Sequence, residues 1–190
     1  MSAHPSVKAV VIGGSAGSLA SLLVILKSLP TSYGPAVFMT VHVPPDAKRS
    51  MLVDILQTHC QVTVCEAQDK AHANGGTIYV APSNYHLLIE TSGSIALSVD
   101  DPVLFSRPSI DVLFESAADA YGSELVGVLL SGANHDGAHG LKLIEQAGGR
   151  VLIEDPANAY APVMPRAALV ACPQAWVGSP SQIASYLKDL

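Results

Sequence analysis

The feature that most constrains the fold is an apolar strand that runs directly into a glycine-rich turn and an amphipathic helix, between Lys8 and Leu29. Residues 9–12 are apolar and mostly β-branched, which is typical of a buried strand. After the turn, leucines recur at the spacing of a helix with one apolar face. They are Leu19, Leu22, Leu23, Leu26 and Leu29. The segment therefore predicts a strand, a tight turn and a helix.

The turn itself, residues 13–17, fits the pattern Gly-x-Ser-x-Gly. This pattern lifts a serine onto a sharp bend between a strand and a helix, where its hydroxyl is exposed. Gly13 and Gly17 permit the close approach and strained dihedrals that such a bend needs. The backbone N–H groups after Ser15 face the same space as its hydroxyl, so an attacking serine would have oxyanion donors beside it. Ser15 is therefore the candidate nucleophile.

The rest of the chain continues the alternation of apolar strands and helices. Strands are predicted at 36–41, 62–66, 125–130, 150–154 and 175–177, and helices at 50–58, 109–121, after 137, at 165–171 and 179–190. Residues 75–99 differ, because three short strands at 77–81, 86–90 and 94–99 are separated by short turns that predict a small antiparallel meander. We expect an α/β fold: a single domain over residues 1–190 with a doubly wound, mostly parallel sheet flanked by helices, and the meander at one edge or end.

Composition and charge disfavour several classes of function. The 190-residue chain has a formal net charge of −6 and no basic run longer than Lys48-Arg49. Nucleic-acid binding needs a basic surface, so we expect no nucleic-acid partner. The three cysteines fit no zinc spacing and indicate apolar fillers in a reducing compartment. Glycines and serines interrupt the uncharged run at 9–26, so we expect no membrane insertion and a cytoplasmic location.

Three predicted strands end in residues that could form a hydrolytic triad. The ligand crevice of a doubly wound sheet lies at the carboxyl ends of its strands, where the sequence places Ser15, His42 and Asp136. These supply a nucleophile, a general base and an acid that orients the base. We expect His42 Nε2 to approach Ser15 Oγ, and Asp136 to bind the other imidazole nitrogen. Each residue alone has a simpler explanation as a helix cap, a strand-end histidine or a turn residue; their shared location favours the triad.

Other chemistries have weaker support. The glycine-rich turn superficially resembles a dinucleotide-binding turn, but positions 15 and 18 are not glycine, and His42 stands where a ribose-binding acid is expected. His135, Asp136 and His139 could suggest a metal site. Exposed histidines at the start of a helix are the simpler account, so no metal is expected.

Two further acids, Asp46 and Asp111, compete with Asp136 as the residue that orients His42. Asp46 follows two prolines, and Asp111 lies in the first turn of a predicted helix, where the helix dipole alone favours an acid. Ser109 precedes that turn and is the predicted N-cap. The histidines with no partnered context are interpreted as surface or sheet residues: His4, His59, His72 and His86.

With these residues in place, the chain resembles the catalytic domain of the chemotaxis protein-glutamate methylesterase (CheB-like) family over essentially its whole length. The family's Gly-x-Ser-Thr-Gly-Gly is matched by residues 13–18, its His-x-Pro by residues 42–44, and its Gly-Met-Gly-x-Asp-Gly-Ala by residues 132–138. Residues 107–114 and 164–168 are also similar. Five segments in the family's order make the resemblance specific.

The resemblance implies hydrolysis of glutamyl methyl esters on the cytoplasmic helices of methylated chemoreceptors, with deamidation of receptor glutamines as a related activity. It implies that Ser15 attacks the ester, His42 transfers the proton and Asp136 holds His42. Further residues of the matched motifs are expected to bind the oxyanion or position the substrate: Ala16, Gly132, Ala133 and Arg107. The implied chemistry needs no cofactor.

The chain departs from the family pattern at Ala16, Ser18, Ala133 and Asn134. A lost donor near an oxyanion can lower a rate on the order of 10²-fold. The alternative is therefore a weakened or inactive relative that acts as a signalling interaction module, and a nucleotide-binding domain is a third, less favoured class. The family usually carries an N-terminal receiver domain, whereas the motifs here begin at the start of the chain, so a separate or removed receiver domain is a further implied partner.

Overall fold

The computed structural model describes residues 6–42 and 51–190 of the protein. Its centre is a seven-stranded sheet of order β3-β4-β2-β1-β7-β8-β9, in which all neighbouring strands are parallel. The strands are β1 (Ala9–Gly14), β2 (Ala36–Val41), β3 (Thr63–Glu66), β4 (Thr77–Val80), β7 (Leu125–Leu129), β8 (Arg150–Glu154) and β9 (Trp176–Gly178). From β1 the chain first builds the sheet toward β3 and later toward β9. The change of direction at β1 and β7 is the point where such sheets form a crevice.

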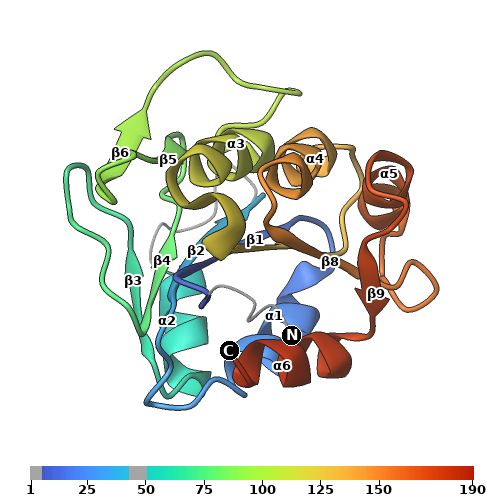
Figure 1. The fold of residues 1–190 in the computed structure, drawn as a ribbon, viewed down its shortest axis with the longest axis horizontal. Coiled ribbons are helices and arrows are strands. Elements are labelled where there is room, and N and C mark those ends of the chain that lie inside the picture. The colour runs from blue at the N-terminus through green and yellow to red at the C-terminus, as the bar shows by residue number, and fades with distance from the viewer. Residues whose placement is uncertain (1–5, 43–50) are drawn as a thin grey trace.

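Helices cover both faces of the sheet (Figure 1). One layer contains α3 (Ile110–Tyr121), α4 (Ala138–Gln146) and α5 (Val163–Ala171), and the other contains α1 (Ser18–Leu26), α2 (Met51–His59) and α6 (Pro180–Lys188). A short 3₁₀ helix, η1 (Gly122–Glu124), leads into β7. The predicted doubly wound α/β fold is confirmed.

The sequence of the central strand β1 does not alternate between polar and apolar residues, because the strand is buried on both faces. Ala9 and Val11 belong to the hydrophobic core beneath α3, α4 and α5, whereas Val10 and Ile12 belong to the core beneath α1 and α6. All four are fully buried. A strand with a core on each side must be apolar throughout, which fixes β1 in the middle of the sheet.

The segment 75–99 differs in part from the prediction. Strands β5 (His86–Ile89) and β6 (Ile95–Ser98) form the expected antiparallel hairpin, a separate two-stranded sheet. The strand predicted at 77–81 is not part of it, because β4 pairs with β2 and β3 in the main sheet. Its side chains alternate between the two cores, and Tyr79 stacks on Phe38 of β2. The short turn after β4 indicated a hairpin, but burial on both faces draws the strand into the parallel sheet.

Two predicted features, the prolines that end the second strand and the serine cap at Ser50, lie outside the described residues. Within the described ranges, no helix combines the length and the apolar character needed to cross a membrane.

Candidate active site

The register of the central strands places the candidate nucleophile, Ser15, between the segments that follow β2 and β7. Gly14 of β1 pairs with Val41 of β2, and His42, the residue after β2, donates its N–H to Gly14 O at 3.1 Å. On the other side, Ser15 donates its N–H to Ser131 O at 2.8 Å. Because the strands are parallel and in register, Ser15, His42 and Ser131 all emerge at the same carboxyl edge of the sheet.

The turn after β1 holds Ser15 at the entrance of helix α1. Ser18 binds Ser15 O twice, through its backbone N at 3.1 Å and its Oγ at 2.8 Å. Gly17 adopts a φ of +78°, and a Cβ at this position would lie 2.4 Å from the side chain of Tyr160. Only glycine meets both conditions. The half-buried Ser15 therefore precedes α1 by one tight turn, as the Gly-x-Ser-x-Gly pattern predicts.

Two buried polar residues beyond the turn support it. Ser131 Oγ donates to Ala16 O at 2.7 Å and accepts from Ala161 N at 2.8 Å. The carboxylate of Glu154, at the end of β8, accepts from Ser131 N and from Ser21 Oγ, each at 2.8 Å. Glu154 is 2% exposed. This support was not predicted from the sequence, although an acid at the end of an otherwise apolar strand is a visible signal for it.

His42 and Asp136 meet as predicted, through a different nitrogen from the one expected. The bond joins His42 Nε2 to Asp136 Oδ2 at 2.8 Å, and Asp136 is fully buried. An acceptor on Nε2 fixes the proton there and leaves a lone pair on Nδ1. In the described part of the chain neither Nδ1 nor Ser15 Oγ has a hydrogen-bond partner. Nδ1 is thus the free atom that can accept a proton; catalytic hydrogen bonds often form only when substrate is bound.

Asp136 is held by three donors besides His42. Its carboxylate accepts from Ser109 Oγ at 2.9 Å, Ile110 N at 2.7 Å and Asp111 N at 3.0 Å. Burial alone would raise the pKa of Asp136, but the bond from His42 and the bonds from the start of α3 outweigh it and hold the pKa below its ordinary value. Asp136 is therefore an anion at the N-terminus of α3, where the helix dipole also favours negative charge.

The residues at the start of α3 do not play the roles predicted from sequence. Ser109 occupies the N-cap position, but its hydroxyl makes no capping bond and binds Asp136 instead. Asp111 caps the neighbouring helix, since its Oδ1 accepts from Gly137 N at 3.0 Å and Gly140 N at 2.7 Å. Asp136 caps α3 and Asp111 caps α4. Of the competing acids, Asp136 is the one bound to His42; Asp46 lies outside the described residues.

His86 lies on β5, so its interpretation as a sheet residue is confirmed, but it has partners that the sequence did not indicate. It is 1% exposed and bonded through both ring nitrogens. Nδ1 accepts from Ser109 N at 3.2 Å, so Nε2 carries the proton that binds Asp101 O at 3.1 Å. Residues 86 and 109 are 23 positions apart and meet only in the folded protein, so no local pattern in the sequence indicates this contact.

The four residues predicted to position substrate divide into two pairs. The exposed Ala16 and Ala133 have backbone N–H groups with no acceptor in the described part of the chain, so both can serve an oxyanion. Gly132 already donates its N–H to Ala161 O at 3.0 Å. Arg107 Nη1 donates to Val99 O at 2.8 Å and Asp100 O at 3.0 Å, which stabilises the segment before α3. The N–H of Gly132 is not available to an oxyanion.

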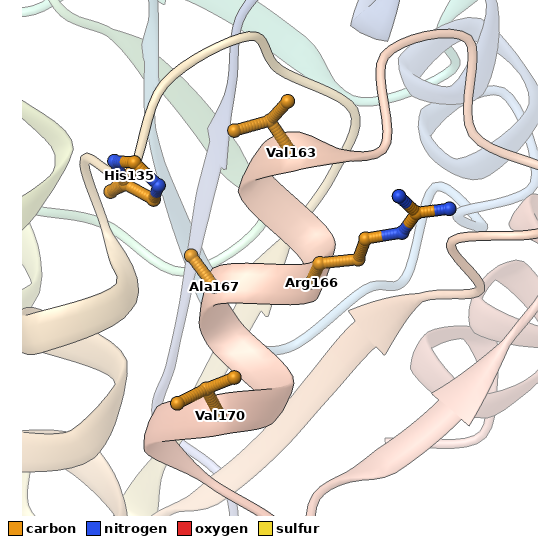
Figure 2. Close-up of a pocket in the computed structure, with 5 residues that line it drawn as sticks. All are labelled: His135, Val163, Arg166, Ala167 and Val170. Carbon is orange, nitrogen blue, oxygen red and sulfur yellow. The ribbon is translucent and has the colours of Figure 1, made fainter.

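An apolar groove of about 470 Å³ lies beside the Asp136 loop, lined by His135, Val163, Arg166, Ala167 and Val170. Figure 2 shows His135 facing α5, with Arg166 extending from the helix away from it. None of Ser15, His42 and Asp136 lines this groove. The candidate active site is therefore identified from its hydrogen bonds and not from a pocket. His135 and His139 are both exposed, and the described residues contain no group of three or more acidic, histidine or cysteine side chains placed to hold a metal ion.

Comparison with known proteins places this arrangement in a family. A family model described as CheB methylesterase matches residues 10–187. The chain belongs to the CheB methylesterase family. The crystal structure of the Thermotoga maritima CheB methylesterase catalytic domain matches it with a TM-score of 0.91 and 30% identity, over 97% of this chain and 99% of that one.

Curated CheB-family relatives are similar over most of the chain. A Leptospira interrogans protein, provisionally named a protein-glutamate methylesterase/protein-glutamine glutaminase, is 42% identical over 93% of this chain and 91% of its own length. Proteins that carry this name in Bordetella parapertussis and Chromohalobacter salexigens are 39% and 38% identical over 86% and 87% of this chain. The match covers 47% of each of these two, so the chain spans about half their length.

Proposed function

We propose that this CheB-family chain is a serine hydrolase that removes methyl groups from glutamyl methyl esters of chemoreceptors and acts as a glutaminase on receptor glutamines. The observation that carries the proposal is the bond from His42 Nε2 to the buried carboxylate of Asp136. The backbone N–H of His42 in turn binds the carbonyl of Gly14, the residue before Ser15. This arrangement supplies a base with an orienting anion beside a serine on a tight turn. The names of the family relatives supply the substrate class.

In the first half of the proposed reaction, Ser15 Oγ forms a bond to the ester carbonyl carbon while His42 Nδ1 takes the hydroxyl proton. The negative charge on the carbonyl oxygen is met by the N–H groups of Ala16 and Ala133, both of which are unused in the described structure. The carbon–oxygen bond to methoxide then breaks, and the imidazolium returns its proton to give methanol. Asp136 stabilises the imidazolium and fixes its orientation.

In the second half, water attacks the acyl-enzyme. His42 takes a proton from this water, the bond to Ser15 breaks, and the serine recovers a proton as glutamate leaves. With an amide in place of the ester, the same steps release ammonia and convert glutamine to glutamate. The acyl-enzyme divides one difficult substitution into two easier ones.

The partners and setting follow from the same proposal. The substrate protein is a methylated receptor whose modified helices lie in the cytoplasm, and residues 1–190 act there as one catalytic domain. Two of the relatives are about twice as long as the match, and a receiver domain, as part of a longer protein or as a separate one, is the proposed regulator.

The test is methanol release from receptor membranes carrying labelled methyl groups. Ser15→Ala should lower the rate by roughly 10⁶-fold, because the nucleophile of a triad is lost. Ser185→Ala, in an exposed hydroxyl of α6, is the matched control and should leave the rate unchanged. Release that persists in Ser15→Ala would refute the assignment.

The same pair of variants separates the enzyme from a binding module. A fluorophosphonate probe should label wild type and Ser185→Ala with one equivalent at Ser15, and should not label Ser15→Ala. A folded wild-type protein that binds receptor but takes up no probe would favour the inactive alternative.

A further inference from the structure

The strongest feature that the proposed mechanism does not use is a hydrogen-bonded network of polar groups behind Asp136, which is buried except at its Asp101 end. It runs from the Asp101 carbonyl through the imidazole of His86 to Ser109, and from Ser109 Oγ to Asp136 Oδ1. Asp136 then contacts His42 with its other oxygen, Oδ2. This hydrogen-bond network joins the β5–β6 hairpin to the candidate active site.

Ser109 is unusual for a serine at the start of a helix. It has the extended backbone of an N-cap, with φ −105° and ψ 140°, but its side chain makes no capping bond. The cap of α3 is provided by Asp136, which accepts from Ile110 N and Asp111 N. The Ser109 hydroxyl is thereby free to donate to Asp136, at 2.9 Å, and it is fully buried.

His86 determines where that hydroxyl lies. The backbone N–H of Ser109 has His86 Nδ1 as its acceptor, and without this acceptor a buried N–H would lose its partner. Because Nδ1 accepts, the imidazole must carry its proton on Nε2, where it binds Asp101 O. Both ring nitrogens are thus used, and the ring has a single orientation.

We propose that Ser109 and His86 are positioning residues for the hydrolase: Ser109 fixes Asp136 Oδ1 so that Oδ2 faces His42, and His86 fixes Ser109. The proposal rests on the proposed function only for its effect on rate. The role of the pair is to keep the Asp136 carboxylate in one rotamer, and neither residue touches the substrate.

Removal of the hydroxyl has a definite consequence for Asp136. A carboxylate with one donor fewer is less stabilised as an anion, so the pKa of Asp136 rises in Ser109→Ala. It also binds a protonated imidazole more strongly, so the acid limb of the kcat/KM profile should move to higher pH. The carboxylate has more rotational freedom, and kcat should fall about tenfold, the size of effect that a hydrogen bond to a charged group commonly carries. KM should stay within about twofold, since substrate contacts are intact.

The matched control is Ser116→Ala. Ser116 Oγ also links α3 to β5, since it accepts from Ile89 N at 3.1 Å, but it makes no contact with Asp136. It should leave kcat, KM and the pH profile unchanged. Ser109→Thr keeps the hydroxyl and should restore most of the rate lost in Ser109→Ala.

His86 is tested by a pair of variants. In His86→Asn the amide oxygen stands near the position of Nδ1 and still accepts from Ser109 N, whereas His86→Leu removes the acceptor. We expect His86→Leu to lower kcat at least as much as Ser109→Ala, and His86→Asn to retain several times the rate of His86→Leu. Equal loss in both would overturn the role of His86.

A readout independent of activity is the titration of Asp136 followed by its side-chain ¹³C carboxyl resonance. A raised Asp136 pKa in Ser109→Ala supports the positioning of Asp136 by Ser109, even if Ser15→Ala disproves the esterase assignment. An unchanged Asp136 titration, or the same loss of rate in Ser116→Ala as in Ser109→Ala, overturns the proposal.

Discussion

At the scale of single residues, the candidate site depends on which imidazole nitrogen meets the acid. His42 binds Asp136 through Nε2, so in the proposed mechanism Nδ1 is the ring atom that takes the proton from Ser15. Asp136 can hold this tautomer because it is ionised and accepts only. Its buried charge is balanced by hydrogen bonds from His42, two backbone N–H groups and Ser109.

In the proposed mechanism, Asp136→Asn should therefore remove the basic lone pair of His42 Nδ1 while the imidazole itself stays in place. An amide turned to donate to Nε2 would place the imidazole proton on Nδ1, where Ser15 needs a lone pair. We expect kcat for methanol release to fall on the order of 10⁴-fold. Asp119→Asn, at an exposed position of α3, is the control for loss of a carboxylate and should keep its rate. A fall of only a few-fold in Asp136→Asn would show that Asp136 does not set the tautomer.

At the scale of elements, the site is assembled by two helices that cap each other. Asp136, in the loop before α4, caps α3, and Asp111, in the first turn of α3, caps α4. The helices approach closely at Gly140, where a Cβ would lie 2.5 Å from Phe114 Cβ and 3.0 Å from Asp111 O. This packing places the Asp136 loop against the start of α3.

Gly140→Ala tests the importance of that approach. Alanine is the better helix former by about 1 kcal/mol, but the added methyl must push α4 away from α3, which typically costs about 1–3 kcal/mol. We expect a net loss of about 1 kcal/mol in the free energy of unfolding by urea, together with lower kcat because the capping bonds of Asp111 lengthen. Gly34→Ala is the control, since a Cβ there meets nothing within 4 Å. A stabilised, fully active Gly140→Ala would contradict the tight packing.

The same elements show how far the sequence could lead. The β1 turn, the strand-end His42 and Asp136 follow from local pattern, because period and turn chemistry report on a segment of a few residues. The roles of Ser109, Asp111 and His86 depend on contacts between residues 23 to 29 positions apart, and no local signal encodes them. Membership of β4 in the main sheet was missed for the same reason.

At the scale of the whole molecule, the sheet separates two hydrophobic cores and the polar network lies along one edge of it. Within this network the pKa values of two neighbouring carboxyl groups, Asp111 and Asp136, are shifted in opposite directions. Burial raises the pKa of Asp111, and the charge of Asp136 adds to this, against the bonds from Gly140 and Gly137 and the attraction of His139. The pKa of Asp136 is lowered. The pH dependence of stability therefore contains two opposing contributions.

Their signs can be separated with Asp111→Asn. A group whose pKa is raised on folding binds protons more tightly in the folded state, so it lowers stability as pH rises from its ordinary value of 3.8 through the raised value. Asparagine retains an oxygen that can accept from Gly137 N and Gly140 N but has no charge. The free energy of unfolding of the variant should therefore increase relative to wild type as pH rises through this window, and then stay level. Asp136 acts oppositely, since its stabilisation is lost only as pH falls below 3.8 toward its lowered pKa. Urea titrations at a series of pH values from about 3 to about 7 measure the difference, and a difference that shrinks with rising pH would show that the pKa of Asp111 is not raised.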